Sequence, residues 1–251
     1  MIDILMVTWE RPEITERVIK SINYNTKPGT YRLLVVDNGS GPETTSILHS
    51  LKDEGFIDVL IMNDTNRGLE PARNQLLVQA NSRYIVTTDS DCVPMRMDPD
   101  TGKDWLEKLV QLMEKYSEYA AISSRTQVMI GTGNIYDGHE DEDIVEFGHP
   151  GGSLRIMRRN AVDDVFGWRE QETGRGSEEK YICGKLRENG WKTGFAVKVR
   201  CLHLFGDRSK GTDRWGYPVD WLPSATGHSD IWHPVLQNGD DINEIKGYTD
   251  V

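Results

Sequence analysis

Apolar residues in the first third of the chain alternate between short strand-like runs and helical patterns. Runs rich in branched aliphatic residues are typical of buried strands and cover residues 3–8, 31–37, 58–62 and 84–88. Between them, apolar side chains recur at helical spacing after Pro12, Pro42 and Leu69. Repeated strand–helix units predict an α/β fold with a mostly parallel sheet flanked by helices. In such folds ligands bind at the carboxyl ends of the strands, so the residues after each strand are the candidates for function.

The second half of the chain is less regular. The pattern predicts helices over 103–116 and 178–188, and strands over 119–123, 151–157 and 192–199. The glycine-rich segment 131–148 carries an acidic run and is predicted to be a surface loop. We expect one α/β domain with at most a small appendage. An irregular, aromatic extension over 207–251 is expected to pack on the same domain.

Composition narrows the classes of partner. The net charge of −11 and the pI near 5.1 argue against nucleic acid and anionic lipid as main partners. No apolar stretch approaches the roughly 20 residues of a membrane span, and the N-terminus lacks the basic region of a signal peptide. The three cysteines are widely spaced, which favours a reducing cytoplasm. Peripheral membrane contact through the 207–251 extension stays open.

The residues Asp89-Ser90-Asp91 follow the fourth predicted strand. Side chains alternate along an extended chain, so the two aspartates point to one side. Two adjacent carboxylates repel one another, and Mg²⁺ or Mn²⁺ relieves that repulsion while leaving coordination positions for phosphate oxygens. An acidic turn that ends the strand is the alternative interpretation.

Two earlier strand ends carry compatible chemistry. Asp37-Asn38 follows the second strand, where a carboxylate can accept a hydrogen bond from a nucleobase or a ribose hydroxyl. An Asx turn at Asp37 is the alternative, and both can hold together. After the third strand, Gly68 allows close backbone approach, and Arg73 offers its guanidinium to phosphate or to an aspartate.

With these motifs in order, the chain resembles the family 2 glycosyltransferases, whose fold is called GT-A. The resemblance runs from about residue 2 to residue 206 and implies a Rossmann-like nucleotide-binding half over about 1–92 and an acceptor half over about 93–206. Besides the segments above, it rests on Val7-Thr8 with Arg11, Gly151-Gly152-Ser153 with Arg158-Arg159, Gly167-Trp168, Glu178-Glu179 and Arg200-Cys201-Leu202-His203.

The resemblance implies a site for a nucleotide-diphosphate sugar. Asp37 would contact the base, usually uracil, and Thr8 with Arg11 would hold the nucleoside. Arg73 would brace the diphosphate or the metal-binding aspartates. The remaining nucleotide-binding residues by this resemblance are Asn38, Gly68, Asp89 and Ser90.

The same resemblance implies a cation site for Mn²⁺ or Mg²⁺. Asp91 would bind the metal directly, and Asp89 would contact the ribose or a metal-bound water. His203 would be a further metal ligand, although a buried, hydrogen-bonded core histidine is the alternative.

The general base is expected in the Glu178-Glu179 pair. The family's usual Glu-Asp is Glu-Glu here, so the base maps to Glu179, and the choice between the two glutamates stays open. Acidic residues also favour the first turn of helices for dipole reasons alone. An in-line attack by an acceptor hydroxyl on the sugar carbon, opposite the departing phosphate, would invert the anomeric centre.

The expected function is therefore metal-dependent, inverting transfer from a nucleotide-diphosphate sugar, with UDP as the expected nucleotide, to a hydroxyl acceptor in surface glycan synthesis. A sugar-nucleotide nucleotidyltransferase is one alternative, but Thr8-Trp9-Glu10-Arg11 lacks that class's glycine-rich first junction. A non-catalytic nucleotide- or glycan-binding module with the same fold is the other.

Overall fold

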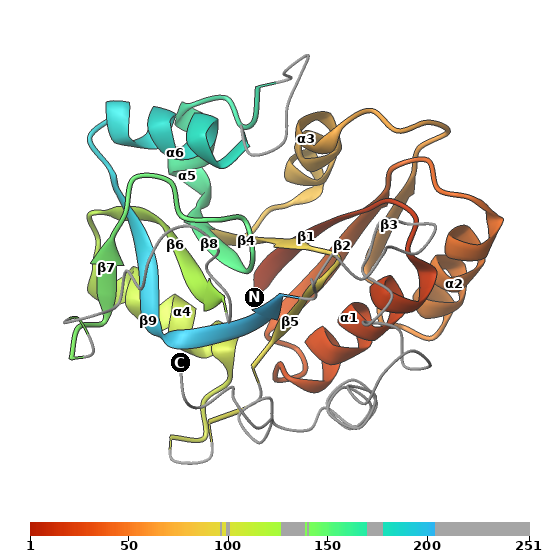
Figure 1. Cartoon of the computed structure of the whole chain (residues 1–251), viewed down its shortest axis with the longest axis horizontal. Coiled ribbons are helices and arrows are strands. Elements are labelled where there is room, and N and C mark those ends of the chain that lie inside the picture. The colour runs from red at the N-terminus through yellow and green to blue at the C-terminus, as the bar shows by residue number, and fades with distance from the viewer. Residues whose placement is uncertain (96, 99–100, 127–138, 140, 170–177, 204–251) are drawn as a thin grey trace, which may run out of the picture.

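A computed structural model of the chain describes residues 1–95, 97–98, 101–126, 139, 141–169 and 178–203, of which 126, 202 and 203 are described by their backbone only. The predicted extension over 207–251 and half of the glycine-rich segment lie outside these residues. A nine-stranded mixed sheet forms the centre, in the order β3-β2-β1-β4-β8-β6-β9-β5, with β7 paired to β9. Figure 1 shows helices on both faces of this sheet.

The elements have the following bounds. The strands are β1 (Ile2–Thr8), β2 (Tyr31–Asp37), β3 (Val59–Met62), β4 (Tyr84–Asp89), β5 (Cys92–Pro94), β6 (Tyr119–Thr126), β7 (Ile144–Glu146), β8 (Arg155–Arg158) and β9 (Lys192–His203). The helices are α1 (Pro12–Tyr24), α2 (Pro42–Asp53), α3 (Leu69–Gln79), α4 (Trp105–Lys115), α5 (Arg159–Asp164) and α6 (Glu178–Glu188).

The first half is the parallel α/β unit that the pattern predicts. Strand β1 pairs in parallel with β2 on one side and with β4 on the other. The register sets Thr8 opposite Asp37 and Val7 opposite Asp89. Parallel strands end at the same edge of a sheet, so this pairing brings the ends of β1, β2 and β4 together. The predicted fold class is confirmed.

The second half adds strands mainly in antiparallel fashion. Strand β8 pairs antiparallel with both β4 and β6, and β9 then runs parallel to β6. The far end of β9 pairs antiparallel with β5, with His203 opposite Cys92. Strand β9 is longer than the predicted 192–199 because this second pairing extends it.

Part of the predicted surface loop 131–148 is a strand. Residues Ile144–Glu146 form β7, which pairs antiparallel with β9 and sets Val145 opposite Phe195. Both side chains are buried in a small apolar cluster. The loop prediction was wrong at this point because three residues are too few to show a strand period beside an acidic run. Residues 131–138 and 140 lie outside the described chain.

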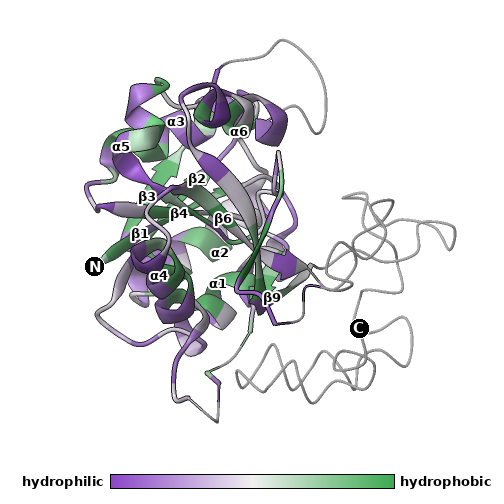
Figure 2. Cartoon of the chain, turned by 90° about the vertical axis from the view of Figure 1, so that its left-hand side faces the viewer, coloured by the Kyte–Doolittle hydropathy of each residue, from purple (hydrophilic) through white to green (hydrophobic). Residues whose placement is uncertain are grey.

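Two apolar clusters fill the space on either side of the sheet. One joins the sheet to α1, α2 and α4, and the other joins it to α3, α5 and α6. Figure 2 shows apolar strands enclosed by helices whose outward faces are hydrophilic. This is the three-layer arrangement of an α/β domain. Among the described residues no helix is long and apolar enough to cross a membrane.

Helix α4 is held at both ends by buried polar groups. Asp104 is fully buried. Its carboxylate accepts hydrogen bonds from the backbone N–H of Glu107 at 2.7 Å and from the backbone N–H of Lys27 at 2.8 Å. The Glu107 carboxylate in turn accepts from the Asp104 backbone N–H, which completes a capping box. At the other end Arg158 donates to the Met113 carbonyl at 2.5 Å. These contacts fix α4 to the loop after α1 at one end and to β8 at the other.

We expect Asp104→Ala to lower the free energy of unfolding by about 2 kcal/mol, because it removes an N-cap and leaves the Lys27 N–H unpaired. Urea denaturation monitored by circular dichroism measures this change. The control is Asp53→Ala at the exposed end of α2, which should alter stability by less than about 0.5 kcal/mol. Equal effects of the two substitutions would contradict the capping role.

Candidate active site at the carboxyl ends of the strands

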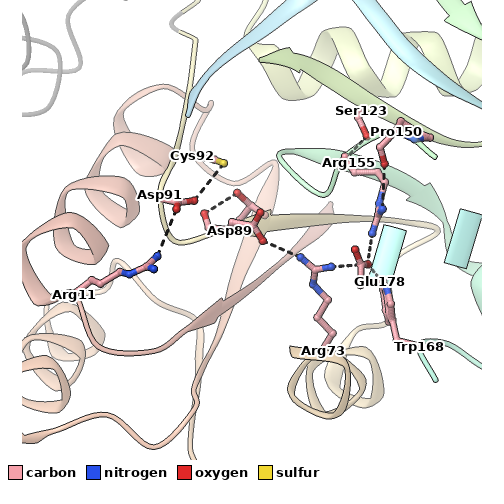
Figure 3. Close-up of polar contacts among 12 residues, drawn as sticks. Arg11, Arg73, Asp89, Asp91, Cys92, Ser123, Pro150, Arg155, Trp168 and Glu178 are labelled. Carbon is pink, nitrogen blue, oxygen red and sulfur yellow. Dashed lines mark hydrogen bonds and ion pairs between the residues drawn. The ribbon is translucent and has the colours of Figure 1, made fainter. Parts of the chain in front are cut away.

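The aspartates of Asp89-Ser90-Asp91 are each paired with a different arginine. The Asp89 carboxylate lies 2.9 Å from Nη2 of Arg73, which comes from α3. The Asp91 carboxylate lies 3.5 Å from Nη1 of Arg11, which directly precedes α1. Figure 3 shows the two arginines approaching from opposite sides. Their positive charges reduce the repulsion between the carboxylates.

The donor set at this turn fits a divalent cation. Ligand atoms of Asp89, Asp91 and Cys92 all lie within 4.8 Å of one another. Carboxylate oxygens suit Mg²⁺ and Mn²⁺. The backbone of His203 lies opposite Cys92 in the sheet, which brings this predicted ligand to the same turn. The His203 side chain lies outside the described part of the chain.

The loop after β1 has an uncommon backbone. Glu10 and Arg11 have φ values of 57° and 61°, in the left-handed region that residues other than glycine seldom adopt. The Glu10 N–H donates to Oγ of Ser40 at 2.7 Å, and its carboxylate accepts from the Gly41 N–H at 3.0 Å. These bonds tie the first strand end to the second and direct Arg11 toward Asp91.

Asp37 and Asn38 organise the neighbouring loops. Both carboxylate oxygens of Asp37 accept from Ser40, one from its N–H at 2.9 Å and one from its hydroxyl. The Asx-type turn considered for Asp37 is therefore present. The side-chain amide of Asn38 donates to the Gly68 carbonyl at 3.0 Å, and its oxygen accepts from the Arg67 N–H at 3.0 Å. Asn38 thus sets the position of the loop that contains Gly68.

Thr8 and Ser90 are also at this edge but are largely enclosed. Thr8 is 1% exposed, and its hydroxyl lies 3.1 Å from the hydroxyl of Thr15 in α1. Its carbonyl accepts from the Asn38 N–H at 2.8 Å. Ser90 is buried in the turn between the two aspartates. The structure therefore brings Thr8 and Ser90 to the predicted edge, with Thr8 joined to α1 and to the loop after β2.

A buried ion network lies beneath the aspartates. Glu178, the first residue of α6, is 3% exposed, and its Oε1 lies 2.5 Å from Nη1 of Arg73 and 2.5 Å from Nη2 of Arg155. The indole N–H of Trp168 donates to the same oxygen. Burial raises the pKa of Glu178, but the charges of Arg155 and Arg73 outweigh that effect and bring its pKa to about 2.

Glu179 occupies a different environment from its neighbour. A Cβ atom placed on Gly152 would lie 3.2 Å from Nη2 of Arg73 and 3.6 Å from Oε1 of Glu179. Gly152 therefore lies close to both Arg73 and Glu179 and has no side chain to fill the space beside them. Glu179 is partly exposed, whereas Glu178 is enclosed. Of the two glutamates, Glu179 is the one that solvent reaches.

Sequence reasoning missed Arg155 and assigned no chemistry to Trp168. Arg155 is fully buried in β8, and its guanidinium also approaches the Pro150 carbonyl at 3.4 Å. The available signal was an arginine inside the apolar run Leu154-Arg155-Ile156-Met157, because a cation rarely enters a buried strand unless it is paired.

Residues 3–169 match the family described as Glycosyl transferase family 2. The chain belongs to this family.

The fold is also similar to that of solved glycosyltransferases. A mannosyltransferase from Pyrobaculum calidifontis, in complex with GDP-Man and Mn²⁺, has a TM-score of 0.66 at 18% identity over 82% of this chain and 57% of that one. Staphylococcus aureus TarS residues 1–349 with UDP-GlcNAc has a TM-score of 0.61 at 15% identity, over 84% of this chain and 61% of that one.

Curated relatives share between a fifth and a quarter of their aligned residues with this chain. The poly-beta-1,6-N-acetyl-D-glucosamine synthase of Staphylococcus aureus strain COL is 23% identical over 212 residues, which is 75% of this chain and 46% of the relative. The synthase of Staphylococcus epidermidis is 22% identical over 93% of this chain and 57% of the relative. The chain thus spans about half the length of the curated relatives it matches.

The ion network predicts a specific acid dependence of stability. Because the pKa of Glu178 falls from 4.5 to about 2 on folding, its charged form stabilises the fold fully above pH 4.5, and this contribution is lost as pH falls toward 2. We expect wild type to exceed Glu178→Gln in unfolding free energy by a constant amount above pH 5, and the difference to shrink below it. Urea titrations across the acid range measure this.

The matched control for the acid titration is Glu188→Gln, at the other end of the same helix, where the side chain is 64% exposed. Its difference from wild type should be small at every pH. A Glu178→Gln difference that stays constant through the whole acid range would contradict the burial of an ionised Glu178.

Proposed function

We propose that the chain is a metal-dependent, inverting glycosyltransferase that moves a sugar from a nucleotide-diphosphate donor to a hydroxyl acceptor. The observation that carries this proposal is the juxtaposition at one strand edge of Asp89, Asp91 and Arg73 with Glu179 beyond Gly152. Family membership favours glycosyl transfer over nucleotidyl transfer. The curated relatives are polysaccharide synthases, which supports a role in surface glycan synthesis.

The donor site would extend along the ends of β2, β1 and β4. We infer that Asp37 receives the base, with UDP as the expected nucleotide, and that Thr8, Arg11, Asn38, Gly68 and Ser90 shape the nucleoside and phosphate site. Asp91 would hold Mn²⁺ or Mg²⁺ directly with His203, and Asp89 would contact the ribose or a metal-bound water. The cation would neutralise charge on the departing diphosphate, and Arg73 adds a fixed positive charge on the same side.

We assign the general base to Glu179. Arg73 and Arg155 hold Glu178 as a buried anion whose pKa is about 2, so Glu178 is a weak proton acceptor at neutral pH. Glu179 is partly exposed and lies beside Gly152. In this proposal the acceptor hydroxyl would lie there and face the sugar from the side opposite the phosphates. Proton removal by Glu179 during in-line attack on the sugar carbon would invert the anomeric centre.

We propose a cytoplasmic location for this domain. The cysteines Cys92, Cys183 and Cys201 are all free and buried, which agrees with a reducing compartment.

Metal-dependent nucleotide binding tests the donor site. We expect UDP or a UDP-sugar to raise the melting temperature of the wild-type chain when Mn²⁺ is present, because a cation held by Asp91 would supply positive charge for the diphosphate. Asp91→Ala should weaken this binding by at least about tenfold in calorimetric titration, since it removes the direct ligand. GDP-sugars belong in the same screen.

The control for Asp91→Ala is Asp141→Ala, which changes an exposed carboxylate of the second half and should leave nucleotide binding unchanged. If no nucleoside diphosphate stabilises the wild type with metal, the donor assignment is wrong.

Substitution of Glu179 separates binding from transfer. Glu179→Gln should keep nucleotide affinity near wild type while kcat for transfer falls by about 10²- to 10⁴-fold, because the amide cannot take the acceptor proton. Product formation and anomeric configuration are followed by NMR. Glu188→Gln in the same helix is the control and should retain full activity. Wild-type turnover in Glu179→Gln would refute the assignment of this base.

A further inference from the structure

A chain of four alternating charges crosses the boundary between the two halves of the domain. Arg155 of β8 pairs with Glu178 of α6, Glu178 pairs with Arg73 of α3, and Arg73 pairs with Asp89 at the end of β4, at 2.5, 2.5 and 2.9 Å. Figure 3 shows Arg73 between the two carboxylates and Glu178 between the two arginines. Arg155 and Arg73 are 0% and 1% exposed, so water screens them little.

The charges in this chain balance when equal numbers of cations and anions are present. The two arginines repel each other, and both are held near Oε1 of Glu178. If Glu178 loses its charge, two buried cations remain with Asp89 as the one anion of the set. If Arg155 and Glu178 both lose their charges, Arg73 and Asp89 remain as a balanced pair. The electrostatic cost of altering Glu178 therefore depends on Arg155.

Arg155 also contacts the segment that borders Gly152. Its Nη1 approaches the Pro150 carbonyl at 3.4 Å, while its Nη2 holds Glu178. The neighbouring Gly151 carbonyl accepts from the Ser123 hydroxyl at 2.6 Å. One buried side chain thus joins the glycine segment to the first turn of α6, which carries Glu179.

We propose that Arg155 and Glu178 form a positioning pair, which holds Arg73 toward Asp89 and holds the start of α6 so that Glu179 lies beside Gly152. The inference rests on the proposed function, because its effects are read through nucleotide binding and transfer. It assigns neither residue to contact with the substrate. It adds Arg155, which no sequence motif singled out, and it gives Glu178 a role distinct from that of the base.

The effect of Arg155→Met on UDP affinity should depend on whether Glu178 carries its charge. Glu178→Gln should weaken Mn²⁺-dependent UDP binding by about tenfold, because Arg155 then repels Arg73 with no anion between them. Arg155→Met alone should leave that affinity within about threefold of wild type but lower kcat by about tenfold or more, because Glu178 still holds Arg73 while the glycine segment loses its clamp.

The double variant Arg155→Met/Glu178→Gln decides the question. We expect Arg155→Met to restore UDP affinity in the Glu178→Gln background to within about threefold of wild type, while kcat stays low. The matched control is Lys185→Met/Glu188→Gln, an exposed ion pair of the same helix with side chains 42% and 64% exposed. Neither control substitution should change affinity or kcat, alone or combined.

The measurements are calorimetric titration with UDP and Mn²⁺, and steady-state kcat and KM, on full-length chains whose unfolding midpoints are recorded first. If Arg155→Met does not fold, Arg155→Lys replaces it; this variant keeps the charge but loses the second contact, and should retain UDP affinity with a lowered kcat. Wild-type kcat in Arg155→Lys would overturn the proposal.

Two further outcomes are distinguishable. A double variant that binds UDP as weakly as Glu178→Gln, with wild-type binding intact, overturns the positioning pair and leaves the proposed function standing. A wild-type chain that binds no nucleoside diphosphate with Mn²⁺ overturns the donor site and the positioning pair together.

Discussion

The site depends on one buried carboxylate held between two arginines. Glu178 takes Arg73 on one side and Arg155 on the other, both at 2.5 Å, in a place that solvent scarcely reaches. Burial of a single unpaired charge carries a large desolvation penalty. Each charged side chain of the set is therefore stable in this place only when its partners are charged as well. Because Arg73 continues to Asp89, this interaction joins the acidic turn of the first half to the helix that carries Glu179.

Strand pairing supplies the frame for this interaction. The parallel pairing of β1 with β2 and β4 brings Asp37, Thr8 and Asp89 to one edge. The reversal of direction at β8 then lets Arg155, at the start of that strand, lie opposite Thr87 near the end of β4. A parallel strand in this position would place its first residue at the other edge of the sheet. The mixed sheet therefore brings the two halves of the candidate site together.

Sequence patterns predicted the elements that repeat over enough residues to show a period. The first four strands and the helices that follow were located within a few residues, and helix α6 begins and ends at Glu178 and Glu188 as predicted. The short elements β5, β7 and α5 were not predicted, because three to six residues carry too little periodicity. Strand β7 also depends on β9, which lies some fifty residues away along the chain, and a local pattern contains no information about that pairing.

The sequence by itself determined the family resemblance, the α/β class and the order of the acidic motifs, because these follow from local periodicity and from residue types at fixed spacing. It could not separate Glu178 from Glu179, because two adjacent glutamates at a helix start have the same side-chain chemistry and the sequence does not show their neighbours in space. The tertiary structure gives the two glutamates different environments. It surrounds Glu178 with Arg73, Arg155 and Trp168, residues from three distant segments, and leaves Glu179 beside Gly152. Burial and charge depend on those neighbours, and only folding brings them together.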